Sequence, residues 1–282
     1  MRRLVFIAAA AVGALCAQKR PAPSKQIVIA RPTIHQFEDG PPVGSRHQFV
    51  PGETVFFSFQ ISGYTASDKN QVLVSHQVEV FDAAGVRVVE TQSGKTDVEL
   101  APEDKDWMPK LRHQFLIPPF AATGVYKIVA SAKDELSGAT AREELALGVR
   151  GWTVEPSDKL LVKNFRFLRS EEAPDPMPAA VYHPGDTLWA RFEITGYKLA
   201  EKNRYHVEYG LSVQRANGEE LYAEPKAADE REESFYPRRF LPGILSLSLQ
   251  KDIATGQYAI VVRVRDQLGG QSFETRQTFQ IE

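Results

Sequence analysis

One stretch of this chain occurs twice, and this duplication constrains the fold more than any other feature. Residues 122–138 read ATGVYKIVASAKDELSG, and residues 254–270 read ATGQYAIVVRVRDQLGG. In each copy a glycine, Gly124 or Gly256, precedes apolar side chains at every second position, which is the period of a β-strand with one buried face. An aspartate and a glycine then follow, as in a turn. Each copy therefore predicts a strand and the turn after it.

The duplication extends over most of the chain. A shift of 133 residues places Pro51-Gly52 on Pro184-Gly185, Gly63-Tyr64 on Gly196-Tyr197 and Gly85 on Gly218, and a one-residue deletion then makes the shift 132. Two copies of one fold follow, residues 27–150 and residues 151–282. Alternating apolar patterns without a long helical period predict roughly seven strands per module. The predicted fold class is all-β, with two tandem antiparallel β-sandwiches.

Two strands of each module have legible inward faces. The predicted inward residues are Val55, Phe57, Phe59 and Ile61, Val74, His76, Val78 and Val80, and in the second module Leu188, Ala190, Phe192 and Ile194, Val207, Tyr209, Leu211 and Val213. We expect His76 to be a hydrogen-bonded core residue, because Tyr209 fills its position in the other copy. The charged stretches Thr91–Lys110 and Glu219–Arg239 match poorly and predict long connections between sheets.

The first residues are typical of a secretory signal. Arg2 and Arg3 precede an apolar run over Leu4–Leu15 that is too short to span a bilayer. We therefore expect residues 1–17 to be a signal peptide, residues 18–26 to be a tether, and the rest to be periplasmic or secreted. Lipid attachment to Cys16 is the alternative. Because Cys16 is the only cysteine, a cleaved chain has no thiol for a disulfide or a metal.

The charge balance speaks against nucleic acid as the main partner. Loss of Arg2 and Arg3 removes two positive charges, so the formal net charge of −2 becomes −4, and no basic stripe is present. A membrane would be a partner only if Cys16 carried a lipid.

Gly124-Val-Tyr126 and Gly256-Gln-Tyr258 resemble the tyrosine corner of immunoglobulin-like sandwiches. The resemblance implies that each module is an immunoglobulin-like or fibronectin-III-like domain of bacterial extracytoplasmic type, with each tyrosine ring buried and its hydroxyl bonded to upstream backbone. The sequence departs from true immunoglobulin domains at Ile128 and Ile260, where the second cysteine would fall. Each module is also longer than the usual ~100 residues, so the strand topology stays open.

Four aromatic residues are candidate contacts for a ligand or partner: Phe56, Trp107, Trp189 and Tyr236. Phe56 and Trp189 occupy the same module position on an otherwise polar strand face. Such a ring can be covered by an N-terminal strand or by the long connection, or it can serve as a platform for a sugar or a partner strand.

No familiar catalytic, cofactor or metal motif is present, and we predict no cofactor. The acidic runs around Asp104 and Glu233 favour solvated loops, with calcium binding as the alternative. Asp134 and Asp266 are placed to accept backbone N–H bonds in the turns that follow their strands, or to hold calcium at the sandwich edge.

Export, repetition and the absence of catalytic motifs together predict a non-enzymatic binding or scaffold protein. Its partner would be another protein of the cell envelope, which would meet loops or a sheet edge. The alternative is a carbohydrate-binding protein that stacks sugars on Trp107, Trp189 and Tyr236. A hydrolase with carboxylates such as Asp104 and Glu233 is the third hypothesis.

Overall fold

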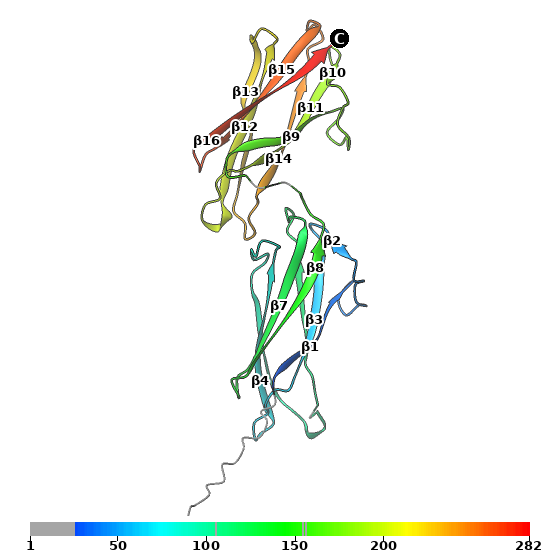
Figure 1. The fold of residues 1–282 in the computed structure, drawn as a ribbon, viewed down its shortest axis with the longest axis vertical. Helices are drawn as coiled ribbons and strands as arrows, with labels where there is room; N and C mark the ends of the chain where they lie inside the picture. Colours follow the sequence, from blue (N-terminus) through cyan, green and yellow to red (C-terminus); the bar gives the residue numbers. More distant parts are fainter. Residues whose placement is uncertain (1–25, 105, 154, 156) are drawn as a thin grey trace, which may run out of the picture.

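The computed structural model describes residues 26–104, 106–153, 155 and 157–282. The predicted signal peptide, Cys16 and nearly all of the predicted tether therefore lie outside the described residues. Within the described ranges, no helix is both long and apolar enough to cross a membrane. Figure 1 shows strands β1–β8 in one half of the molecule and β9–β16 in the other, stacked end to end.

The strands repeat in the same order in both halves. The first half contains β1 (Val28–His35), β2 (Gln48–Phe49), β3 (Thr54–Ser62), β4 (Gln71–Phe81), β5 (Gln92–Glu99), the 3-10 turn η1 (Pro102–Asp104), β6 (Lys110–Leu116), β7 (Gly124–Asp134) and β8 (Thr140–Val149). The second contains β9 (Leu161–Leu168), β10 (Val181–Tyr182), β11 (Thr187–Thr195), η2 (Glu201–Asn203), β12 (Tyr205–Arg215), β13 (Glu220–Glu232), β14 (Phe240–Ser248), β15 (Gly256–Asp266) and β16 (Gln271–Ile281).

Each half is a sandwich of a three-stranded and a five-stranded sheet. The strand orders are β1-β3-β6 and β2-β8-β7-β4-β5 in the first half, and β9-β11-β14 and β10-β16-β15-β12-β13 in the second. The two topologies are identical when each strand is matched to the one eight places later. The all-β fold class is confirmed, with one departure: the two-residue strands β2 and β10 pair in parallel with β8 and β16. Each covers part of a sheet edge that would otherwise be open.

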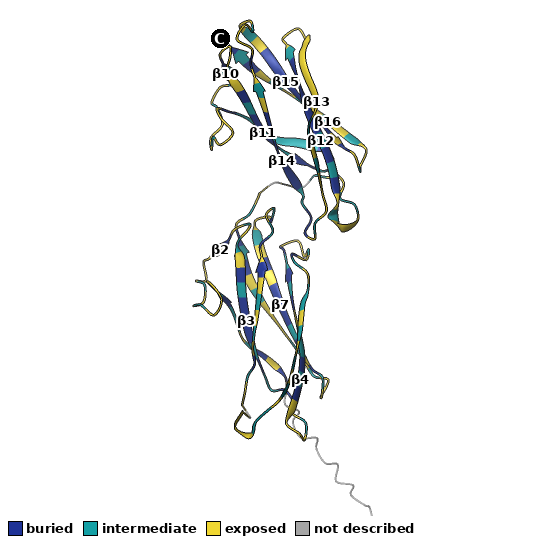
Figure 2. Cartoon of the chain, turned by 180° about the vertical axis from the view of Figure 1, so that it is seen from behind, coloured by how far each residue is buried: buried dark blue, intermediate teal, exposed yellow. Residues whose placement is uncertain are grey.

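The inward faces predicted for β3, β4, β11 and β12 are buried, with the exception of His76. They form two separate hydrophobic clusters, one between the sheets of each half, and Figure 2 shows buried residues along the facing strands. Each large apolar side chain buried in this way contributes about 1.5–3 kcal/mol relative to exposure.

His76 departs from the sequence prediction. It is half-buried, and its ring centroid lies 5.4 Å from that of His113 and 6.2 Å from that of Phe59. Its Nδ1 is buried without a hydrogen-bond partner among the described groups, so the expected hydrogen-bonded core histidine is wrong for that atom. Burial lowers the pKa of His76. Burial and the neighbouring His76 ring lower the pKa of His113 to about 4. Both rings are thus neutral packing elements at physiological pH.

The stretches predicted as long connections are partly strand. β5 and β13 lie at the outer edges of the five-stranded sheets, where each pairs with one neighbour only. The sequence did not locate these strands because an edge strand needs little apolar surface. Its charged residues protect it from pairing with other chains. Because an edge strand makes few contacts, its sequence can differ between the two copies.

Both tyrosines of the repeated stretch are buried, with relative exposures of 0% for Tyr126 and 4% for Tyr258. The Tyr126 hydroxyl donates to the Ala122 carbonyl at 2.9 Å, and the Tyr258 hydroxyl donates to the Ala254 carbonyl at 2.7 Å. Each hydroxyl thereby ties its strand to the connection that precedes it, which is the geometry of a tyrosine corner.

Asp134 and Asp266 are buried at 0% and 2% exposure, where each joins two turns. Asp134 accepts the Thr65 N–H at 2.8 Å, the Leu136 N–H at 3.0 Å and the Ser137 hydroxyl at 2.6 Å. Asp266 accepts the backbone N–H groups of Lys198, Leu268 and Gly269 at 2.8, 3.1 and 2.9 Å. Donors surround both carboxylates, and this arrangement supports the structural reading over calcium binding.

We expect Tyr126→Phe and Tyr258→Phe each to lower the free energy of unfolding by about 0.5–1.5 kcal/mol, because one hydrogen bond is lost. Tyr→Ala at either position should cost about 3–5 kcal/mol. Denaturant titration measures both, with Tyr222→Phe as the exposed control. If the corner variants matched the control, the hydroxyl bonds would have no structural role.

A second prediction concerns pH. Burial alone would raise the pKa of Asp134, but the hydrogen bonds from Ser137, Thr65 and Leu136 outweigh it and lower the pKa below 3.8. A lowered pKa in the folded state means that the carboxylate stabilises the fold at neutral pH and that this stability is lost as the pH falls through the folded pKa.

Asp134→Asn should therefore cost about 1–3 kcal/mol at neutral pH, because several donors lose their charged acceptor, and the difference from wild type should shrink below pH 4. Denaturant midpoints measured between pH 7 and pH 2 test this, with the exposed Asp68→Asn as control. A cost that is independent of pH would show that the charge of Asp134 contributes nothing.

Candidate functional site

The two modules meet at a buried polar contact. Tyr236, from the connection between β13 and β14, reaches the turn after β4, and its hydroxyl donates to Asp82 Oδ2 at 2.8 Å. Asp82 Oδ1 accepts the backbone N–H groups of Ala84 and Val86, and Arg239 lies 3.8 Å from Oδ2. Burial raises the pKa of Tyr236, and Tyr126 and Asp82 act in the same direction, so the hydroxyl keeps its proton.

Tyr236 is therefore not available to a ligand, because it is only 8% exposed and packs with the first hydrophobic cluster. This is a correction to its assignment as a contact residue. The sequence pattern of each module is complete in itself and gives no sign that this connection inserts into the other module.

Aromatic residues surround this contact. The Phe240 ring centroid lies 5.1 Å from that of Trp152 and 5.6 Å from that of Phe120, and the Arg238 guanidinium lies 3.7 Å from the Phe120 centroid. Trp152 is 43% exposed, while its Nε1 donates to the Pro119 carbonyl at 3.1 Å. The junction therefore presents an oriented tryptophan to solvent.

Beside Trp152, the three-stranded sheet of the second module forms a hollow of about 330 Å³. We call it the arginine hollow; its side chains include Trp152, Asn164, Arg166, Arg191, Glu193, Phe240, Pro242 and Ile244. Arg191 on β11 lies directly opposite Arg166 on β9 and Ile244 on β14. Strand register, rather than proximity in sequence, brings these residues together.

The two arginines lack an ionic partner. Among the described residues, no carboxylate oxygen lies within 4.0 Å of either guanidinium. Arg191 donates to the Glu171 carbonyl, and the Nε of Arg166 is buried without an acceptor among the described groups. Glu193 also lines the hollow and accepts a hydrogen bond from the Asn164 side-chain amide at 2.5 Å. Like charges placed directly opposite on neighbouring strands destabilise a sheet, and no ion pair offsets the repulsion between these two arginines.

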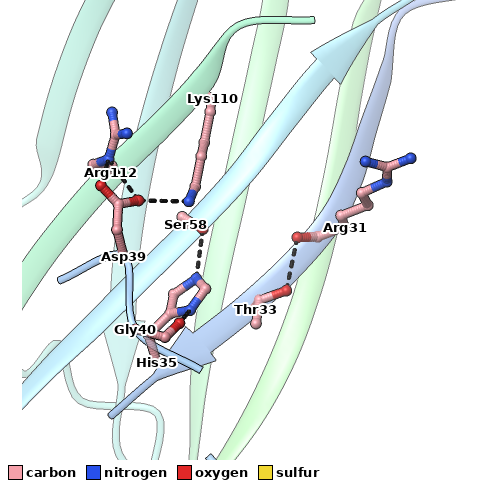
Figure 3. A network of polar contacts seen from close by, with 8 residues as sticks. All are labelled: Arg31, Thr33, His35, Asp39, Gly40, Ser58, Lys110 and Arg112. Carbon is pink, nitrogen blue, oxygen red and sulfur yellow. Dashed lines mark hydrogen bonds and ion pairs between the residues drawn. The ribbon is translucent and has the colours of Figure 1, made fainter. Parts of the chain in front are cut away.

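The corresponding face of the first module is neutralised. A shift of 133 residues places Ser58 at the position of Arg191, and Figure 3 shows Ser58 bonded to His35, with Asp39 between Lys110 and Arg112. Asp39 lies 2.5 Å from Lys110 Nζ and 2.8 Å from Arg112 Nε. Hydrogen bonds from Arg112 and Lys110 lower the pKa of Asp39 to about 2. Lys110 and Arg112 of the first module are therefore paired with Asp39, whereas Arg166 and Arg191 of the second have no ionic partner among the described residues.

The structure does not gather the four aromatic candidates into one site. Phe56 is half-buried on β3, between His35 and Gln114, and Trp107 is 36% exposed at the end of the first module away from the junction. Trp189 is half-buried on β11, two residues from Arg191 and on the same face. None of the four is among the residues that line the arginine hollow.

The sequence showed the alternation that points Arg191 outward, but nothing in it paired Arg191 with Arg166. Trp152 was visible only as a tryptophan between the modules. Knowledge of the register of β9 against β11 would have been needed to find the hollow.

One side-chain cluster has the composition of a metal site. His206, Glu208 and Asp229 each place a potential ligand atom within 4.8 Å of the others. The Lys226 ammonium lies between the carboxylates, 2.6 Å from Glu208 and 2.7 Å from Asp229, and lowers the pKa of both. A cation of the chain itself thus neutralises the cluster.

The carboxylates that were candidates for hydrolysis do not form a pair. Asp104 lies in η1 of the first module, and Glu233 lies in the second module beside Lys202, at 3.2 Å. Two-carboxylate catalysis needs both groups close to one bond, so these two residues cannot act together.

No protein-family model matches the chain, and no curated protein matches it. Among solved structures, it is similar to the C-terminal domain of the Streptococcus pyogenes antigen I/II-family protein AspA, with 10% identity, a TM-score of 0.34, and coverage of 92% of this chain and 99% of that one. The C-terminal domain of the Streptococcus agalactiae AgI/II polypeptide BspA is 11% identical, with a TM-score of 0.33 and coverage of 91% of this chain and 99% of that one. Salmonella alpha-2-macroglobulin is 9% identical, with a TM-score of 0.29 and coverage of 92% of this chain and 16% of that one. Likenesses at these TM-scores support no functional inference, so function has to be inferred from the chain's own residues.

Proposed function

We propose that this chain is an exported, non-enzymatic binding protein of two immunoglobulin-like modules, and that it recognises a carboxylate-bearing segment of another envelope protein in the arginine hollow. The observation that carries the proposal is the opposed, unpaired Arg166 and Arg191 in a recess that has apolar walls. Export rests on the signal-like residues 1–17.

The chemistry of the hollow suits an acidic side chain beside an apolar one. A guanidinium donates two parallel hydrogen bonds to a carboxylate, and such charge-assisted bonds are stronger than neutral ones. Pro242, Ile244 and the Trp152 ring provide apolar contact next to the charges. The bound carboxylate would also relieve the repulsion between the two arginines, so that binding would regain the stability that the empty hollow lacks.

A sugar carboxylate is a second candidate ligand, because Trp152 exposes an aromatic ring beside the arginines. Sugars stack on such rings, and an acidic sugar would satisfy both features. A glycan array that contains neutral and uronic-acid glycans separates the two candidates from each other.

The proposal predicts which peptides the chain selects. In a displayed random-peptide library, the chain should enrich sequences with Asp or Glu next to an apolar residue. Arg191→Gln and Arg166→Gln should each weaken the selected peptides about tenfold to a hundredfold, because a charged hydrogen bond worth about 1.5–3 kcal/mol is lost.

Arg112→Gln is the matched control, since Arg112 lies on the equivalent face of the first module but is paired with Asp39. It should leave peptide affinity unchanged. Equal losses in all three variants, or a selection without acidic residues, would contradict the proposal.

Stability provides an independent prediction. Arg166→Gln should leave the free energy of unfolding unchanged or raise it by up to about 1 kcal/mol, because it removes a like-charge contact. Denaturant midpoints measure this. A clear destabilisation would identify Arg166 as a structural residue and not as part of a binding site.

A further inference from the structure

The far end of the second module carries the counterpart of the surface that receives Tyr236. Matching the repeats places Arg215 at the position of Asp82, Ala254 at that of Ala122 and Tyr258 at that of Tyr126. In the first module this end is covered by Tyr236. In the second it borders a cavity of about 560 Å³, which we call the distal socket; its lining includes Val213, Arg215, Tyr222, Leu249, Ile253 and Tyr258.

The distal socket is open because one edge strand is placed differently. In the first module Val88 is 2% exposed and belongs to the hydrophobic core. Its counterpart Leu221 is 39% exposed and Tyr222 is 46% exposed, because the pairing of β12 with β13 shifts register here and sets Tyr222 opposite Val213. Two large apolar side chains and the socket are thus left at the end of the molecule without cover.

The opposite end of the molecule carries the counterpart of the inserting connection. The Tyr64 hydroxyl donates to the Trp107 carbonyl, and the Tyr197 hydroxyl donates to the Arg238 carbonyl, so Trp107 corresponds to Arg238. β4 runs from this end toward the junction, and Gln71 at its start pairs with Glu99 at the end of β5. The residues that follow β5 therefore lie at the end remote from the junction, where Trp107 is 36% exposed.

Arg215 and the acidic residues near Trp107 have the opposite signs to the charges at the corresponding places of the junction. At the junction, an acidic surface with Asp82 receives a connection that carries Arg238 and Arg239. At the free ends, the distal socket carries Arg215, and the connection with Trp107 carries Glu103, Asp104 and Asp106 together with one cation, Lys105. Arg215 forms only an exposed contact with Glu219, which contributes little and can be exchanged. Asp252 is the one carboxylate among the socket residues.

We infer that copies of this chain associate head to tail, with Trp107 and its acidic neighbours of one copy in the distal socket of the next. The contact would place this connection against the socket as the connection between β13 and β14 lies against the first module at the junction, with Trp107 at the position of Arg238, and it uses no residue of the arginine hollow. Because Figure 1 places the modules end to end, the two surfaces lie at opposite ends. A head-to-tail contact between surfaces at opposite ends leaves one surface free at each end of a dimer, so further copies can add.

Sedimentation velocity of the chain that begins at Gln18, over a range of concentrations, tests the inference. The wild type should show species that grow beyond a dimer as concentration rises. Trp107→Ala and Arg215→Glu should each weaken association at least about tenfold, as truncation of a central contact does. Phe37→Ala, an exposed aromatic on a side loop, is the control and should assemble like the wild type.

Mixing the variants gives the decisive result. An equimolar mixture of Trp107→Ala and Arg215→Glu retains one intact connection and one intact socket, so it should form one-to-one dimers and nothing longer. A monomeric wild type, a Trp107→Ala variant that assembles normally, or a mixture that stays monomeric would overturn the inference.

Discussion

The hydrogen bond from the Tyr236 hydroxyl to the Asp82 carboxylate is buried between the two modules. Asp82 is held in place by two backbone N–H groups of its own turn, so it presents a fixed acceptor to the second module. Breaking the bond would leave a buried carboxylate without one of its donors, which costs more than an exposed contact would. This bond is the one buried side-chain hydrogen bond between modules in the described part of the chain.

The arginine hollow depends on that junction. Trp152 lies between the modules and is packed against Phe240, which follows Tyr236 by four residues. If the modules moved independently, Trp152 would no longer form a wall beside Arg166 and Arg191. Duplication therefore does more than repeat one module, since the contact between copies shapes a surface that neither copy has alone.

Periodicity predicted the parts of this fold that face inward. The alternation in β3 and β11 was sufficient to locate buried faces, because it depends on local pattern, and the resemblance of the repeated Gly-x-Tyr to a tyrosine corner located both tyrosine hydroxyl bonds. The strands β5 and β13 were not predicted, because edge strands carry charge on both faces and lack the alternating pattern. The pairing of Arg166 with Arg191 was not predicted, because strand register brings them together. The contact of Tyr236 was not predicted, because its partner Asp82 lies 154 positions away in the sequence.

Nuclear magnetic relaxation of backbone amides tests the central claim, that the junction makes the two modules one rigid unit. In the wild type, amides of both modules should report a single overall rotational correlation time, with a shared diffusion axis. In Tyr236→Ala, the two modules should report separate and shorter times while each stays folded. Independent tumbling already in the wild type would contradict the account.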